Sequence, residues 1–374
     1  MATLNQKFIA VEKQLQDAFI ERHNEARGLT LAALSGNHIF FVGPAGTAKS
    51  AMIKWYCDRF GASYFTWLLT RFSTPDELFG PVDITAMKNG SYRRITKGKL
   101  PESQVAFLDE IFKANSAINN SMLSVLNERI YHNDGAPVKI PLIFAAAASN
   151  EIPDDDESLG ALYDRFLIRF NVEYIRERQN FLKLLLDHNA VNGAGADNIT
   201  IDELNEARDQ TKMVKLTHSF IEAYADLREA LKAENIKVSD RRFVQALGVF
   251  KANAWLDGRR ECDVSDLAAG GNLFWDKPAD AKKVMGICLK ISDPNLFKAQ
   301  RLYEAADDAA KIIIEAGATG KDNTENAIKV TAQLKKIIAE IEGMAGKSAR
   351  ISDMANKVRD MNKEVMRKGL GLNV

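Results

Sequence analysis

The chain has 374 residues, of which 46% are hydrophobic and 27% are charged, and its 50 lysines and arginines balance its 50 aspartates and glutamates. This length suggests two or three domains with ample apolar residues for packed cores. A formal net charge of zero gives no electrostatic reason for nonspecific adhesion to nucleic acid or anionic lipid, so nucleic acid is a disfavoured partner.

The amino-terminal segment lacks the features of a targeting sequence. Residues 1–7 contain no basic segment followed by an apolar run, and the longest strongly apolar stretch, residues 142–148, is too short to span a membrane. We therefore expect no signal peptide, no membrane insertion and a cytoplasmic location. The three cysteines and five histidines lack paired or ligand spacing, so neither disulfides nor a zinc site is expected.

The first sixty residues predict two helices followed by a strand, a loop and a helix. Residues 7–26 carry apolar side chains at helical spacing, and residues 29–34 form a second short helix that Gly36 ends. Residues 38–42 are aromatic and β-branched, as is typical of a strand, and residues 51–60 return to helical composition.

Further buried strands are predicted where short apolar runs alternate with helical segments. These runs are residues 64–69, 105–108, 142–148 and 167–172. Such alternation indicates an α/β fold with a parallel sheet covered by helices on both faces. Two segments break the alternation and predict hairpins, residues 83–95 turning at Asn89-Gly90 and residues 130–140 turning at Asp134-Gly135.

No convincing strand follows residue 172, so the remainder is expected to be all-α. An Asn/Gly/Ala-rich loop at 189–198 and the break at 276–278 divide it, which gives predicted domains of 1–172, 173–275 and 276–374. The last domain carries coiled-coil-like seams, Leu334, Ile337, Ile341 and Met344, then Ile351, Met354, Val358, Met361 and Val365. The seams indicate either a bundle packed on its own body or an arm that docks a partner.

The loop after the first strand has the pattern of a phosphate-binding loop. It reads Gly43-Pro44-Ala45-Gly46-Thr47-Ala48-Lys49-Ser50, and Ala48 stands where the strict pattern has a second glycine. Backbone N–H groups of such a loop surround a triphosphate, Lys49 would neutralise the β and γ phosphates, and Ser50 would hold Mg²⁺. Ala48 is tolerable if its φ angle is negative.

Two further strand ends carry polar residues suited to phosphoryl transfer. The strand at 105–108 runs into Asp109 and Glu110, where Asp109 would bind Mg²⁺ and Glu110 would polarise the attacking water. The run at 142–148 ends in Ser149-Asn150, and because ligands of open α/β sheets sit at the carboxyl ends of strands, Asn150 is expected to face Lys49 and Glu110 and to orient that water.

These motifs together resemble the MoxR group of AAA+ ATPases. Their order is the lysine loop, the Asp-Glu strand, the polar strand tip and then Asp164-Arg165-Phe166. Residues 69–81 (LTRFSTPDELFGP), 147–153 (AASNEIP) and 161–165 (ALYDR) resemble its branch called regulatory ATPase variant A. The likeness covers residues 1–275, and alanine before the loop lysine is usual in that branch.

The resemblance implies an AAA+ core, an all-α lid and roles for two arginines. Arg165 resembles the arginine finger that acts on the nucleotide of a neighbouring subunit, with Arg129 as a second candidate. Ser239-Asp240-Arg241-Arg242 resembles the sensor 2 segment, in which Arg241, or else Arg242, reaches the γ phosphate of the same subunit's nucleotide.

The implied activity is Mg²⁺-dependent ATP hydrolysis by a hexameric ring that acts as a chaperone-like remodeller or activator of a partner protein. Members of this family usually act with a partner that bears a von Willebrand factor A (vWA) domain. Two alternatives stay open at this point: a binding scaffold that ATP organises with incidental turnover, and a DNA-dependent motor, which the balanced charge disfavours.

Overall fold

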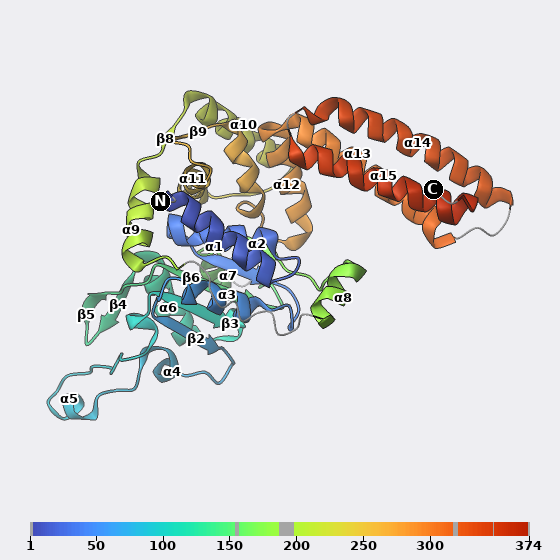
Figure 1. Cartoon of the computed structure of the whole chain (residues 1–374). Helices are drawn as coiled ribbons and strands as arrows, with labels where there is room; N and C mark the ends of the chain where they lie inside the picture. The colour runs from blue at the N-terminus through green and yellow to red at the C-terminus, as the bar shows by residue number, and fades with distance from the viewer. Residues whose placement is uncertain (1–2, 154–156, 187–197, 317–320, 347, 373–374) are drawn as a thin grey trace. The chain divides into compact units, whose positions relative to one another are not determined.

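The computed structural model describes residues 3–153, 157–186, 198–316, 321–346 and 348–372 (Figure 1). Contacts between residues divide the chain into two compact units, Met1–Met285 and Gly286–Val374. The domain limits at residues 172 and 275 remain predictions.

A five-stranded parallel sheet forms the centre of the first unit. Its strands are β1 (Ile39–Val42), β2 (Tyr64–Leu68), β3 (Val105–Asp109), β6 (Phe144–Ser149) and β7 (Ile168–Asn171), in the order β2-β3-β6-β1-β7. All five strands match predicted runs, and every neighbouring pair is parallel. The central strand β6 is entirely buried and contains four consecutive alanines. Helices flank this sheet, as expected for strands buried on both faces (Figure 1).

The amino-terminal helices differ from the expected pattern. The chain forms α1 (Leu4–Ala18) and α2 (His23–Ser35) where one continuous helix over residues 7–26 was predicted. The break contains Glu21, whose φ of 58° is incompatible with a right-handed helix. Gly36 ends α2 in a left-handed conformation, as predicted, and α3 (Lys49–Asp58) follows the first strand.

Only the second predicted hairpin has the expected form. Strands β4 (Ile130–Asn133) and β5 (Ala136–Lys139) pair antiparallel across Asp134 and Gly135, which have φ angles of 55° and 74°. The prediction for residues 83–95 is wrong because a helix, α5 (Ile84–Lys88), occupies much of the segment. The side chain of Asp83 starts this helix by accepting hydrogen bonds from two backbone N–H groups, and a single antiparallel bridge, Val82 to Arg94, remains of the hairpin.

The rest of the first unit is mostly helical, but it is not free of strands. Two-residue strands β8 (Lys215–Leu216) and β9 (Glu261–Cys262) pair in parallel, which is a local exception in the expected helical lid. Two residues are too few for a detectable pattern. The remaining elements are α4 (Pro75–Phe79), η1 (Leu100–Glu102), η2 (Ile111–Lys113), α6 (Ser116–Glu128), α7 (Glu157–Tyr163), α8 (Arg178–Leu186), α9 (Ile201–Lys212), α10 (His218–Ala233), α11 (Asp240–Leu256) and η3 (Val264–Asn272). Helix α12 (Pro278–Ser292) begins in the first unit and ends in the second. The predicted loop at 189–198 lies, except for Asn198, outside the described residues.

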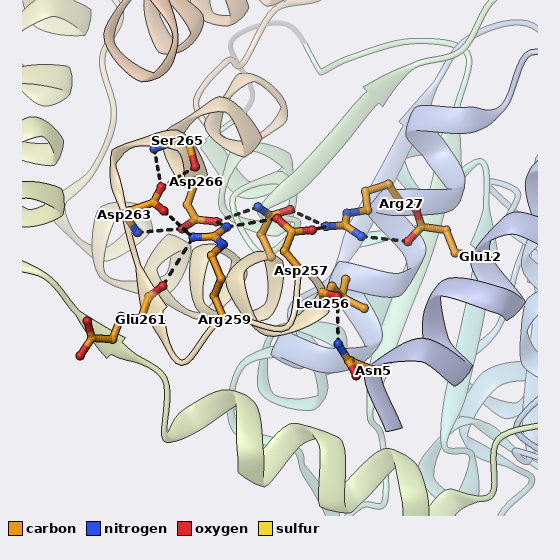
Figure 2. A network of polar contacts seen from close by, with 11 residues as sticks. Asn5, Glu12, Arg27, Leu256, Asp257, Arg259, Glu261, Asp263, Ser265 and Asp266 are labelled. Carbon is orange, nitrogen blue, oxygen red and sulfur yellow. Dashed lines mark hydrogen bonds and ion pairs between the residues drawn. The ribbon is translucent and has the colours of Figure 1, made fainter. Parts of the chain in front are cut away.

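A polar network ties α1 and α2 to the helical elements near residue 260 (Figure 2). The Arg259 guanidinium donates two hydrogen bonds of 2.7 Å to the fully buried carboxylate of Asp266. Arg27 donates to Asp257 at 3.2 Å and to Glu12 at 3.4 Å. Charge-assisted bonds of this kind hold the carboxyl-terminal part of α11 against the amino-terminal helices.

The second unit contains a three-helix bundle of α13 (Pro294–Ala316), α14 (Lys321–Ala345) and α15 (Ala349–Leu370). The two predicted seams lie in one apolar core, in which Leu334, Ile341 and Val358 are fully buried. The seams therefore pack within this unit. Among the described residues, none of the helices combines the length and apolar composition that a membrane span requires. The three cysteines are free and buried.

Candidate functional site

The predicted phosphate loop connects the end of β1 to α3 and runs beside the ends of two other strands. The Gly43 N–H donates to the Ser149 carbonyl at 3.1 Å, and a Cβ atom at Gly43 would lie 2.0 Å from the Val172 carbonyl oxygen. Only glycine fits there, because its φ is 145° and the neighbouring backbone leaves no space. The loop is thereby fixed at the carboxyl edge of the sheet, where ligands of such folds bind.

Ala48 does not have the negative φ angle at which an alanine would be tolerable in this loop. Its φ is 64° and its ψ is 19°, which is the left-handed conformation and not the negative φ expected of an alanine. Ala48 directly precedes α3, and its carbonyl accepts the Met52 N–H at 3.0 Å. The methyl group is exposed, so the cost is backbone strain and not a clash.

Lys49 folds back over the loop. Its Nζ donates to the carbonyls of Gly43 and Pro44, both at 2.8 Å, and to the Thr47 hydroxyl at 3.3 Å. Burial lowers the pKa of Lys49, while Asp109 and Glu110 oppose that shift. The ammonium group thus lies inside the loop and near both carboxylates.

Arg22 is a residue of this region that the motifs do not identify. It is 7% exposed and donates to the carbonyls of Glu173 at 2.6 Å, Glu21 at 2.8 Å and Thr47 at 3.4 Å. It therefore joins the break between α1 and α2 to the phosphate loop and to the segment after β7. A single arginine in a helical pattern carries no spacing signal that could have predicted this role.

Glu110 and Asn150 meet across the sheet edge. The Asn150 side-chain amide donates to Glu110 Oε1 at 2.9 Å, and Lys113 lies 3.3 Å from Glu110 Oε2. Glu110 itself has a φ of 51°, so the chain turns sharply after β3. Asp109, one residue earlier, is half-buried, and burial raises its pKa.

The residues of this edge fit ATP with Mg²⁺. Ser50 lies at the second position of α3 with an exposed side chain, and Asp109 ends the neighbouring strand. Hydroxyl and carboxylate oxygens are the ligands that Mg²⁺ prefers. Gly46 has a φ of 80°, and no described residue apart from its chain neighbours lies within 4 Å of the position that a Cβ atom would take, so the loop is open beside Gly46.

Arg165 and Arg241 form a second group of charges. Arg241 pairs with Asp164, and Arg165 donates to the Asn127 side chain at 3.4 Å. Burial lowers the pKa of Arg165, and the positive charge of Arg241 lowers it further. In the described structure neither arginine hydrogen bonds or ion pairs with the phosphate loop of its own chain.

The alternative arginines of the two motifs are occupied by internal bonds. Arg129 donates to the Gly36 carbonyl at 2.9 Å and lies against His38, and Arg242 donates to Asp276 Oδ1 at 2.6 Å. Burial lowers the pKa of both guanidinium groups to about 10. Both side chains therefore serve the fold, and Arg165 and Arg241 are the less constrained member of each pair.

Known proteins resemble this chain in sequence and in fold. A family model described as the MoxR domain in the MoxR-vWA-beta-propeller ternary systems matches residues 6–209, and an AAA lid domain model matches residues 219–288. An uncharacterized protein of Methanocaldococcus jannaschii is 36% identical over 348 residues, with 91% of this chain and 90% of that protein covered. A second one from the same organism is 35% identical over 355 residues and covers 94% and 92%.

A crystal structure from Cytophaga hutchinsonii, described as a "putative ATPase", superposes with a TM-score of 0.58 at 17% identity, over 75% of this chain and 85% of that one. At this identity the match supports the fold alone. The MoxR model, by contrast, spans more than half of the sequence, and the AAA lid model follows it directly. The chain therefore belongs to the MoxR family of AAA+ ATPases.

Proposed function

We propose that this protein is a Mg²⁺-dependent ATP hydrolase that assembles into a hexameric ring and uses turnover to remodel or activate a partner protein. The convergence of Lys49, Glu110 and Asn150 at one edge of the sheet carries this proposal. These residues come from three separate segments, and phosphoryl transfer needs their three functions: charge neutralisation, a base, and a group that orients the base or water.

In the proposed reaction Lys49 exchanges its bonds to the Gly43 and Pro44 carbonyls for bonds to phosphate oxygens. Glu110, oriented by Asn150, accepts a proton from the water that attacks the γ phosphate. Mg²⁺, when bound to Ser50 and Asp109, supplies positive charge that offsets charge on the phosphate oxygens. Asp109 binds such a cation in its ionised form, which burial alone disfavours.

Arg165 and Arg241 are proposed to act together on the nucleotide of an adjoining subunit. Their position beside Asp164, without bonds to the phosphate loop of their own chain, supports this assignment. For Arg241 this proposal differs from the expectation that the sensor 2 arginine contacts the nucleotide of its own subunit. An arginine supplied in this way typically changes turnover by about 10³- to 10⁵-fold.

The partner proposed here carries a vWA domain. The matching family model is defined on MoxR-vWA-beta-propeller systems, which supports a partner of that class. The chaperone-like role, the regulatory ATPase variant A branch and the cytoplasmic location stay predictions. A Glu110→Gln chain loaded with ATP should retain such a partner in a pull-down from the native cell, whereas a Lys49→Ala chain should not.

Mixing two inactive variants tests the shared pocket. Glu110→Gln and Arg165→Ala should each abolish measurable turnover, and mixed rings should regain part of it because one chain supplies an intact cradle and its neighbour an intact arginine. Arg367→Ala, an exposed arginine in the second unit, is the matched control and should keep full turnover. Native mass spectrometry should report assemblies of six 41.5 kDa chains.

Two results would overturn the proposal. Mixed assemblies seen by mass spectrometry without any regained turnover would place Arg165 outside the neighbouring pocket. Single chains that hydrolyse ATP at the full rate, and keep that rate after Arg165→Ala, would remove the need for a ring.

A further inference from the structure

A second pocket lies in the first unit, at the opposite end of β1 from the phosphate loop. It has a volume of about 310 Å³ and is lined by the end of α2 (Leu34 and Ser35), by α9 and by α11. The end of α2 precedes β1, whereas the phosphate loop follows it. At about 3.3 Å per residue, the strand alone separates the two sites by roughly 13 Å.

The charge of this pocket is one-sided. Arg208, Lys212 and Lys251 line it, and none of the described aspartates or glutamates does. Lys212 pairs with the exposed Asp209, and Lys251 donates to the Lys212 carbonyl at 3.1 Å. Burial lowers the pKa of Arg208, and the charge of Arg208 in turn lowers the pKa of Arg129. Positive charge has therefore accumulated here beyond what nearby carboxylates balance.

Two polar atoms of the pocket residues are buried without a hydrogen-bond partner in the described structure, Arg208 Nε and Thr211 Oγ1. Thr211 is 3% exposed, so water satisfies its hydroxyl poorly. Buried polar groups are nearly always paired, and an exception calls for an explanation. Both residues line the pocket, so an acceptor bound there would lie beside these side chains and balance their charge.

We propose that this pocket binds a small organic phosphate, with the phosphoryl group held by Arg208 and Thr211 and neutralised by Lys212 and Lys251. A phosphoryl dianion matches an excess of cations better than a single carboxylate does, and guanidinium groups bind its oxygens in pairs. Leu34, Leu216 and Leu247 line the same pocket and would contact the apolar part of the ligand. The volume is at the small end of ligand pockets, which favours a small ligand.

Methyl NMR on the full chain, with Mg²⁺ and ADP present to occupy the phosphate loop, tests the proposal at the site itself. Inorganic phosphate and phenyl phosphate are the probes, and the methyl groups of Leu34, Leu216 and Leu247 are the reporters. We expect saturable shifts, with phenyl phosphate binding more tightly because only it has an apolar part. If inorganic phosphate binds equally well, the ligand is the free ion and the organic part of the proposal is wrong.

Three variants and two controls assign the binding. Arg208→Gln and Thr211→Val should each weaken it about tenfold or more, since each loses a hydrogen bond to a charged group. Gly248→Leu should block it by filling the pocket without changing any charge. Lys13→Gln, an exposed charge on α1, should leave it unchanged.

The second control, Lys49→Ala, distinguishes this site from the proposed ATP site, because turnover should be lost while phenyl phosphate binding at the leucines persists. Binding that disappears with Lys49→Ala would assign the probe to the phosphate loop and overturn the proposal. So would an absence of saturable shifts in the wild-type chain, or equal weakening by Arg208→Gln and Lys13→Gln, which would indicate unspecific charge screening.

Discussion

Replacing Ala48 by glycine should make the protein more stable, although the change removes a side chain. Ala48 adopts a φ of 64° and a ψ of 19°. For a residue with a Cβ atom this conformation costs about 1–2 kcal/mol, and glycine adopts it without that cost. The methyl group of Ala48 is exposed, so its removal leaves no cavity.

The expected gain is smaller than the strain that is relieved. Glycine gives the unfolded chain more freedom, which offsets about 0.5–1 kcal/mol. The free energy of unfolding should therefore rise by roughly 0.5–1 kcal/mol, which corresponds to an increase of about 1–3 °C in the melting temperature of a large domain. The measurement is thermal unfolding of the full chain followed by circular dichroism and calorimetry.

The same substitution three residues later should have the opposite sign, which makes it the matched control. Ala51 is an exposed residue inside α3, outside the set of positive-φ residues. Ala51→Gly should cost about 1 kcal/mol through helix propensity. If Ala48→Gly lowers the melting temperature as much as Ala51→Gly does, the left-handed conformation of Ala48 is not the source of strain and the reasoning fails.

Three further predictions concern buried groups of both units. His38 is buried and accepts the Ala145 N–H at 2.8 Å, and burial holds its pKa well below 6.5. Unfolded histidine takes up a proton below about pH 6.5 and folded His38 does not, so the free energy of unfolding should decrease as the pH is lowered below that value, by up to about 1.4 kcal/mol per pH unit. Urea unfolding from pH 7.5 to 5.5 measures this decrease, which should be smaller in His38→Asn. Equal slopes in the two proteins would contradict the prediction. Asp266→Ala should cost about 3 kcal/mol, because it removes the fully buried carboxylate that Arg259 binds, and a thermal shift indistinguishable from zero would refute it. Val358→Ala should destabilise the bundle by about 2 kcal/mol and accelerate hydrogen exchange in α15, while exchange in the parallel sheet stays unchanged.

The sheet could be predicted because four of its strands, β1, β3, β6 and β7, are almost entirely buried, whereas β2 is partly exposed. A strand such as β6, with four consecutive buried alanines, appears in the sequence as an unbroken apolar run, and its alternation with helices fixes the fold class. The segment 83–95 shows where this reasoning fails. Asn89-Gly90 is typical of a hairpin turn, but Asp83 caps a short helix just before it. In a segment this short, helix capping competes with strand pairing.

In the candidate site, too, residues in local sequence motifs could be predicted, and residues whose role depends on contacts distant in the sequence could not. The sequence motifs predict Lys49, Glu110 and Asn150 as site residues, which stay predictions, and the contact between the last two follows from the rule that parallel strands end at a common edge. Arg22 lacks such a rule, because its role depends on a helix break and on the carbonyl of Glu173, which is more than a hundred residues away in the sequence. The φ angle of Ala48 could not be predicted from the sequence either, because it depends on how the loop joins α3.

The balanced composition of the whole chain hides a local difference between two cations, the buried Lys49 and the half-buried Arg208. Lys49 and Arg208 both have a pKa lowered by burial, but Asp109 and Glu110 oppose that shift at Lys49, whereas only the exposed Asp209 opposes it at Arg208. A net charge of zero still argues against adhesion to a long polyanion, which would need a broad basic surface. It does not argue against one phosphoryl group in a pocket, because Arg208 has a buried Nε without a hydrogen-bond partner in the described structure, and hydrogen bonds between a guanidinium and a phosphate are stronger than neutral ones.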